Sequence, residues 1–196
     1  YPNKESALSR LSACYLRTND GTKSLEYAKQ AIRLKESESN IVNLSSSFAL
    51  TGEYDQAIET ANRLAEKPNQ HKILLAHIRY LQKDYEQSLS LISEIEANST
   101  LEYKTALVKY YSLLFHSGSK TAAKWLSEME VQFPIRPEDL NDIGHTLMKT
   151  EGNSREVTVI LQKCVNADPG IYQAWQNLEA NLGELGENDL GLEVCN

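Results

Sequence analysis

The sequence predicts an all-α fold, and three observations support this prediction. Apolar residues recur three, four and seven positions apart along most of the chain, as they do on one face of a helix. The alternation of apolar and polar residues that marks a half-buried strand is not found. Glycine (9) and proline (5) are scarce in a chain of 196 residues, whereas a β-rich chain needs many turns. We therefore expect helices joined by short turns and no sheet.

Six helical stretches follow one another at similar intervals. Each begins with one apolar residue and ends with another seven positions later, and they cover residues 8–15, 41–48, 73–80, 107–114, 140–147 and 175–182. Four of them are followed by a glycine, which can end a helix in the left-handed conformation: Gly52, Gly118, Gly152 and Gly186. In the first copy, Asn19-Asp20-Gly21 takes this place.

A second helix is expected after each turn. One of its positions is mostly small and recurs about every 34 residues, at Ser24, Ala57, Ser88, Ala122, Val157 and Gly191. Ala57 and Ala61 lie four positions apart on one face, which lets two helices approach closely. The sequence therefore predicts a single array of helix pairs, at residues 5–38, 39–70, 71–102, 103–136 and 137–171, with a partial copy at 172–196.

This pattern resembles the tetratricopeptide repeat, whose motif is W-x2-L-G-x2-Y followed by G-x-Y-x2-A-x3-F-x2-A. The second copy matches it with Ile41, Leu44, Ser45, Phe48, Gly52, Tyr54, Ala57, Ala61 and Leu64. The last copy supplies Trp175, Leu178, Leu182 and Gly186, and closing prolines are present as Pro134 and Pro169. His77 and Tyr111 depart from the motif, because the family has a small residue there. The resemblance implies a right-handed superhelix of antiparallel helix pairs.

Charge and hydropathy exclude several kinds of partner. The formal net charge is −7, which argues against nucleic acid or anionic lipid, because both require a basic surface. No apolar run approaches the roughly 20 residues that span a bilayer. The three cysteines, Cys14, Cys164 and Cys195, contain no CxxC spacing and are too few for a disulfide framework. We expect reduced thiols.

No catalytic motif is found in the sequence. It contains no HExxH, no glycine-rich phosphate loop and no GxSxG. We expect no catalytic residue, cofactor or metal in this chain, and we expect it not to be an enzyme by itself. What remains is the binding of another protein.

The resemblance implies that ligands contact the first helices, which form the inner wall of the superhelix. The first of two wall positions directly follows the first apolar residue of each helix, and the second wall position lies four residues later. The predicted protein-binding residues at these positions are Val42, Ser46, Leu74, Ile78, Val108, Ser112, Asn141 and His145. The centre of the wall is apolar, so an apolar peptide or an amphipathic helix of a partner is expected to bind there.

Two binding modes of the family are not expected here. The carboxylate clamp needs a lysine and an asparagine at the two wall positions of one repeat, and no repeat has this pair. Sugar-transferase arrays carry an asparagine directly after the first wall position in repeat after repeat. In this chain only Asn43 and Asn177 fit that pattern.

Several alternatives stay open at the level of sequence. The chain is either an adaptor or scaffold, or the recognition arm of a larger enzyme such as a transferase, because it begins without methionine and is interpreted as a piece of a longer protein. A missing segment of the same protein could fill the wall. The truncated sixth repeat, with Trp175, Leu178 and Leu182 expected to be exposed, could self-associate. The thiols favour the cytoplasm, and a bacterial envelope protein is the alternative.

Overall fold

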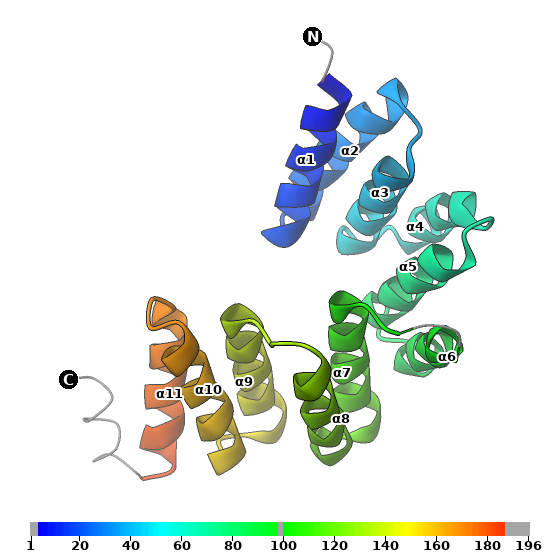
Figure 1. Cartoon of the computed structure of the whole chain (residues 1–196). Helices are drawn as coiled ribbons and strands as arrows, with labels where there is room; N and C mark the ends of the chain where they lie inside the picture. The colour runs from blue at the N-terminus through cyan, green and yellow to red at the C-terminus, as the bar shows by residue number, and fades with distance from the viewer. Residues whose placement is uncertain (1–3, 98–99, 187–196) are drawn as a thin grey trace. The chain divides into compact units, whose positions relative to one another are not determined.

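The computed structural model describes residues 4–97 and 100–186, and these residues form α-helices, one short 3-10 helix and no strand (Figure 1). The elements are α1 (Lys4–Arg17), α2 (Gly21–Leu34), α3 (Glu38–Leu50), α4 (Tyr54–Ala61), η1 (Asn62–Leu64), α5 (Pro68–Leu81), α6 (Tyr85–Glu96), α7 (Tyr103–Ser117), α8 (Ser119–Gln132), α9 (Pro137–Glu151), α10 (Arg155–Ala167) and α11 (Tyr172–Glu184). The predicted all-α class is confirmed. The helices follow one another in pairs that are joined by short turns.

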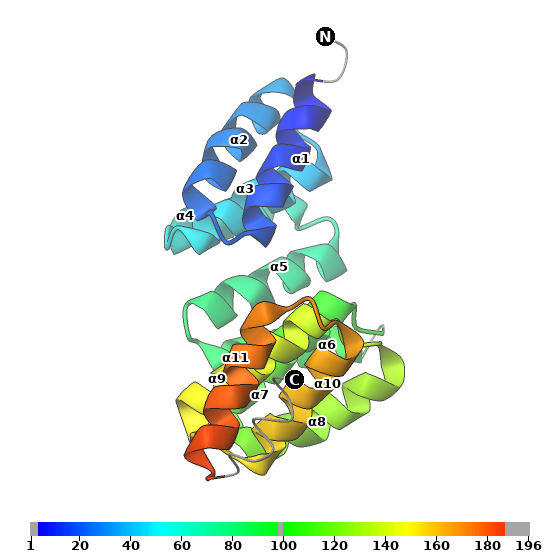
Figure 2. The ribbon, with the colours of Figure 1, turned by 90° about the vertical axis from the view of Figure 1, so that its left-hand side faces the viewer.

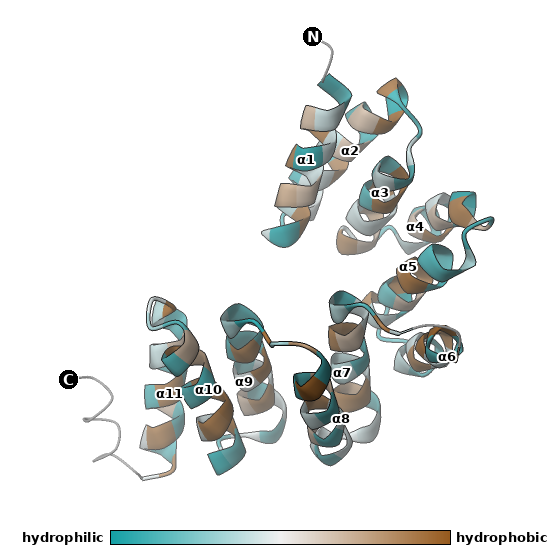
Figure 3. Ribbon diagram, in the orientation of Figure 1, coloured by the Kyte–Doolittle hydropathy of each residue, from teal (hydrophilic) through white to brown (hydrophobic). Residues whose placement is uncertain are grey.

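The chain divides into two compact units, Tyr1–Ala122 and Ala123–Asn196, with the boundary inside α8. In the first unit, α1 packs on α2, α3 on α4 and α5 on α6, and each of these first helices also contacts the next one. Figure 2 shows α1 and α2 side by side, with α3 next to them. In the second unit, α9, α10 and α11 contact one another. Most helices carry both hydrophobic and hydrophilic stretches (Figure 3), as amphipathic helices do.

Polar caps and prolines define where several helices begin. The side chains of four N-cap residues accept a hydrogen bond from the backbone N–H three positions later: Asp20, Ser37, Asp84 and Ser154. Pro68 and Pro137 lie in the first turn of α5 and α9, where no intrahelical donor is needed. The third predicted repeat starts at residue 71, whereas α5 starts three residues earlier because Pro68 favours a helix start.

A glycine with a positive φ follows four of the described first helices, as the sequence predicts: Gly52, Gly118, Gly152 and Gly186. Gly118 and Gly152 follow α7 and α9 with φ of 87° each, a conformation that costs other residues energy. In the third repeat Lys83 takes a positive φ of 64°. The turn geometry is therefore kept even where the sequence offers no glycine.

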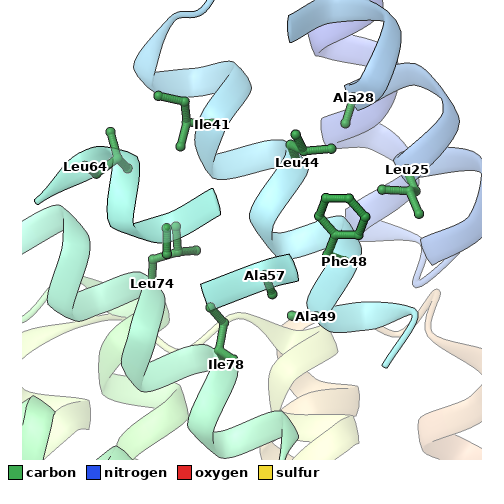
Figure 4. Packing of buried hydrophobic residues seen from close by; sticks show 11 residues of the cluster. Leu25, Ala28, Ile41, Leu44, Phe48, Ala49, Ala57, Leu64, Leu74 and Ile78 are labelled. Carbon is green, nitrogen blue, oxygen red and sulfur yellow. The ribbon is translucent and has the colours of Figure 1, made fainter. Parts of the chain in front are cut away.

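The core of the first unit is an apolar cluster between α2, α3, α4 and α5 (Figure 4). Its buried members are Leu25, Ala28, Ile41, Leu44, Phe48, Ala49, Ala57, Ala61, Leu64, Leu74 and Ile78. Ala57 and Ala61 are fully buried, and the hydroxyl of Ser45 on α3 donates to the carbonyl of Ala57 at 2.8 Å. Small residues on α4 thus allow α3 and α4 to meet at hydrogen-bond distance.

The second unit buries its last helix more fully than the sequence suggests. Leu178 is 0% exposed and Leu182 is 2% exposed, so the expectation that they form an open apolar face is wrong. They are buried because α11 packs on both α9 and α10. Gly144 allows α9 and α10 to pack closely, since a β-carbon there would lie 2.6 Å from Leu161 Cδ2. The rest of the sixth repeat, including Gly191 and Cys195, lies outside the described residues.

Candidate functional site: a half-buried aromatic surface

Three of the predicted binding residues are buried. Leu74 and Ile78 on α5 are 4% and 0% exposed and belong to the core cluster (Figure 4). Ser112 on α7 is also fully buried, and its hydroxyl donates to that of Ser88 at 3.2 Å. Side chains with this little exposure cannot contact a partner in the folded protein. Their selection as surface residues was wrong.

The other predicted residues remain partly accessible. They are half-buried and lie on three helices: Val42 and Ser46 on α3, Val108 on α7, and Asn141 and His145 on α9. The first three belong to the unit Tyr1–Ala122, and the last two belong to the unit that begins at Ala123. Only the first three can therefore be described together with the α5 surface.

A shift in helix register explains the burial of Leu74 and Ile78. In the second repeat Ser45 is joined to Ala57, twelve positions later. In the third repeat the hydroxyl of Ser88 donates to the carbonyl of Ala76 at 2.9 Å, and these residues are again twelve positions apart. The same spacing recurs between α1 and α2. Ala76, and not His77, is therefore the counterpart of Ser45.

This register replaces the predicted α5 residues with their neighbours. Val42 lies three positions before Ser45 and Ser46 one position after it. The same steps from Ala76 lead to Ile73 and His77, both of which are half-buried. The repeat motif aligns Ile73 with Ile41, whereas the hydrogen bonds align Ile41 with the residue before Ile73. The motif therefore predicts Leu74 and Ile78 as wall residues, although both face the core.

The fourth repeat carries the same shift. The hydroxyl of Ser47 on α3 lies 2.6 Å from that of Ser24 in the preceding pair, and Ser112 makes the equivalent contact to Ser88. Ser112 thus corresponds to Ser47. The counterparts of Val42 and Ser46 in this repeat are the half-buried Leu107 and Tyr111, each one position before the residue that was predicted.

The corrected residues form a surface on three neighbouring helices, since α3 contacts α5 and α5 contacts α7. We call it the first-helix strip, and it consists of Val42, Ser46, Ile73, His77, Leu107 and Tyr111. All six side chains are half-buried, and none is fully buried. None of them carries a formal charge at neutral pH, with histidine neutral.

Aromatic rings gather at the α5–α7 end of the strip. We call this the aromatic cluster, and it consists of His77, Tyr80, Tyr85, Tyr111 and Phe115. The rings of His77 and Tyr80 are stacked, with centroids 6.4 Å apart and an interplanar angle of 11°. Tyr85 and Phe115 are also stacked, at 5.3 Å and 22°. The ring of Tyr80 joins the two pairs, because its centroid lies 6.1 Å from the ring centroid of Tyr85. It also lies 6.2 Å from the ring centroid of Tyr111.

The cluster is partly open and uncharged. Phe115 is 41% exposed, and the other four rings are half-buried. Burial lowers the pKa of His77, and the charge of Lys104 lowers this pKa further. Burial raises the pKa of Tyr80 and of Tyr85. Neutral imidazole and protonated phenols are therefore the favoured forms at neutral pH.

The corresponding residues in the second unit are polar and tied to one another. Asn177 on α11 donates to the side-chain oxygen of Asn141 on α9 at 2.9 Å. An equivalent bond joins α3 to α1, where Asn43 donates to the carbonyl of Ser9 at 3.0 Å. Asn43 and Asn177, which have no counterpart in the other repeats, thus hold neighbouring first helices together.

The described residues offer little for other kinds of chemistry. No group of three His, Cys, Asp or Glu side chains in residues 4–97 and 100–186 could hold a metal ion. None of the helices in this part of the chain is long and apolar enough to span a membrane. Cys14 is an exposed free thiol and Cys164 a buried one, whereas Cys195 lies outside the described residues.

A signal for the correct register was present in the sequence. His77 and Tyr111 are bulky residues at a position that the repeat motif keeps small. The residue before His77 is Ala76, so moving the third repeat by one position restores the small residue. It also moves His77 to the wall. In the fourth repeat the same shift places buried Tyr110 at the small position, so the motif alone could not reveal it.

Comparison with known proteins identifies similar structures but no related sequence. No family model matches the chain, and no curated protein matches it. A structure described as the TPR2AB domain of yeast Sti1 in complex with pHSP90 is 13% identical, with a TM-score of 0.43 and coverage of 99% of this chain and 89% of that chain. MamA from residue 41 to its end, from Desulfovibrio magneticus RS-1, is 15% identical, with a TM-score of 0.43 over 98% and 91%. A double mutant of MamA RS-1 is 14% identical, with a TM-score of 0.43 over 98% and 90%.

Proposed function

We propose that this chain is a protein-interaction scaffold that binds an apolar segment of a partner protein on the first-helix strip. The observation that supports this proposal is the continuity of uncharged, half-buried side chains across α3, α5 and α7. Polar and charged residues normally cover such a surface. Aromatic side chains that are held by neighbouring rings and partly exposed are typical of binding hot spots.

Burial of the strip and the aromatic cluster by a partner would favour binding. Apolar surface that a partner removes from water contributes about 25 cal/mol per Å², so several aromatic side chains could contribute several kcal/mol before the costs of association. The rings of the aromatic cluster already contact one another. Little side-chain freedom would therefore be lost on binding, which favours affinity.

The same surface serves both roles that the sequence leaves open. A scaffold would hold one partner beside another, whereas the recognition arm of a larger enzyme would hold its substrate protein. In either case a partner segment covers the strip, and the two roles differ in what the rest of the protein contains. The binding experiment below applies to both.

The proposal is tested by placing a charge at Phe115, the most exposed residue of the aromatic cluster at the end of the strip. Phe115→Glu should abolish the capture of binding partners from a lysate of the source cells, because the partner would bury an unpaired carboxylate. The matched control is Tyr172→Glu, at a 73% exposed aromatic residue on α11. Both variants should keep the wild-type melting temperature within a few degrees. Capture that survives Phe115→Glu would contradict the proposal.

A further inference from the structure

His77 lies in the middle of the first-helix strip, because its helix α5 contacts both α3 and α7. Its ring is half-buried and stacks on the ring of Tyr80. Among the other strip residues only Tyr111 can ionise, and a phenol does so near pH 10. Any proton that the strip takes up between pH 8 and pH 5 therefore goes to His77.

The surroundings of His77 leave a charged ring without compensation. Neither of its ring nitrogens has a hydrogen bond or an ion pair within residues 4–97 and 100–186. The charged group that acts on the ring is Lys104 of α7, which repels an imidazolium, and no described carboxylate of a neighbouring helix offsets it. The titratable groups around the ring are the phenols of Tyr80 on α5, Tyr85 on α6 and Tyr111 on α7. All three lack a negative charge at and below neutral pH.

A partner segment that covers the strip would remove the remaining water from His77. Burial without a counter-ion disfavours the charged ring, so the neutral ring is the form that an apolar segment binds. Binding then releases a proton from any chain that carries one. By linkage, affinity is full above the pKa of the ring in the free chain and falls as the pH drops below it, at most tenfold per pH unit.

We propose that His77 makes binding on the first-helix strip dependent on pH, so that a partner segment is held while the ring is neutral and released when the ring is protonated. This inference rests on the proposed function and adds its regulation. It requires a partner segment with no carboxylate at His77, because a carboxylate would pair with the imidazolium and reverse the dependence.

The test uses the full chain, immobilised. Its probe is the set of proteins that the wild type retains at pH 7.5 from a lysate of the source cells and that Phe115→Glu does not retain. The wild type should retain roughly several-fold less of this set at pH 5.5 than at pH 7.5. His77→Gln cannot titrate and should lose less. His71→Gln, at a ring that lies outside the strip and 3.0 Å from Asn62 Oδ1, should lose as much as the wild type.

Two further measurements accompany the capture experiment. Circular dichroism at both pH values shows whether each variant is folded. If His77→Gln is not, His77→Phe replaces it, since this variant keeps a ring to stack on Tyr80 and does not titrate. Proton NMR titration of the free wild type gives the pKa of the His77 ring, which should match the midpoint at which capture begins to fall.

Three outcomes would overturn the inference and leave the proposed function intact. Retention could be equal at both pH values, as it would be if the ring stays neutral down to pH 5.5. The loss could be the same in the wild type and in His77→Gln, which would place the titrating group elsewhere. Retention could be stronger at pH 5.5 only while His77 is present, which would reveal a partner carboxylate. Failure of the proposed function would appear separately, as retention at pH 7.5 that is insensitive to Phe115→Glu, and it would remove this inference with it.

Discussion

The hydroxyls of Ser24 and Ser47 lie 2.6 Å apart, although they belong to successive helix pairs. Ser24 also donates to the carbonyl of Ser12 at 3.0 Å, so this one side chain contacts the first helix of its own pair and that of the next. Ser88 repeats the arrangement, with bonds to Ala76 and Ser112. Ser24 on α2 thus fixes how α1 and α3 are aligned with each other. Ser88 on α6 does the same for α5 and α7.

Removal of such a serine should destabilise the first unit. We expect Ser24→Ala to lower the free energy of unfolding by about 1–3 kcal/mol, because it leaves the buried hydroxyls of Ser12 and Ser47 without this partner. Urea denaturation provides the measurement. The control is Ser93→Ala at an exposed serine of α6, which should cost less than about 0.5 kcal/mol. Equal losses would show that the buried serines do not hold the register.

The register itself can be tested with two glutamates on α5. Ile78→Glu would bury a carboxylate in the core and should lower the stability by more than about 4 kcal/mol, enough to unfold a marginal domain. Ile73→Glu lies on the half-buried strip, where water can reach the carboxylate, and should leave the fold intact. Circular dichroism during thermal melting distinguishes them. A stable Ile78→Glu variant together with an unfolded Ile73→Glu variant would restore the register that the sequence comparison favoured.

Neighbouring residues on α5 also show how much of this structure can be predicted from the sequence. The 3.6-residue periodicity and the turn glycines identified the helix pairs, because those signals extend over many residues. The wall residues depend on a single-residue register within one helix. Ile73 and Leu74 are both apolar, so hydropathy could not decide between them. The decision comes from the hydrogen bond between Ser88 and Ala76, which is a tertiary contact.

Close packing between α3 and α4 gives a further prediction. Ala57 is fully buried and its carbonyl accepts the Ser45 hydroxyl, so a larger side chain has no space. We expect Ala57→Leu to lower the free energy of unfolding by roughly 1–3 kcal/mol through overpacking. Asp55→Ala, at an exposed position of the same helix, should change it by no more than about 0.5 kcal/mol. Similar costs in a denaturant melt would contradict this orientation of α4.

The last prediction concerns pH and follows from His77. Its pKa in the folded protein lies below the ordinary value of about 6.5, because burial and the charge of Lys104 disfavour the imidazolium. As the pH falls below about 6.5, the unfolded chain takes up a proton that the folded chain does not, so this residue destabilises the protein by up to about 1.4 kcal/mol per pH unit. The loss ends once the pH reaches the folded pKa. Above pH 7.5 the residue should contribute no pH dependence.

Carboxylates also make stability pH-dependent, so the contribution of His77 must be taken as a difference. We expect the loss of unfolding free energy between pH 7 and pH 5 to be smaller in His77→Gln than in the wild type. Lys104→Gln should reduce it partly, because removing the lysine charge returns the folded pKa of His77 toward its ordinary value. Urea melts across this range supply the free energies, and proton NMR titration of the His77 ring supplies its pKa. If the ring titrates above 6.5, or if His77→Gln loses as much stability as the wild type, the half-buried site is open enough to water to hold a charged imidazole.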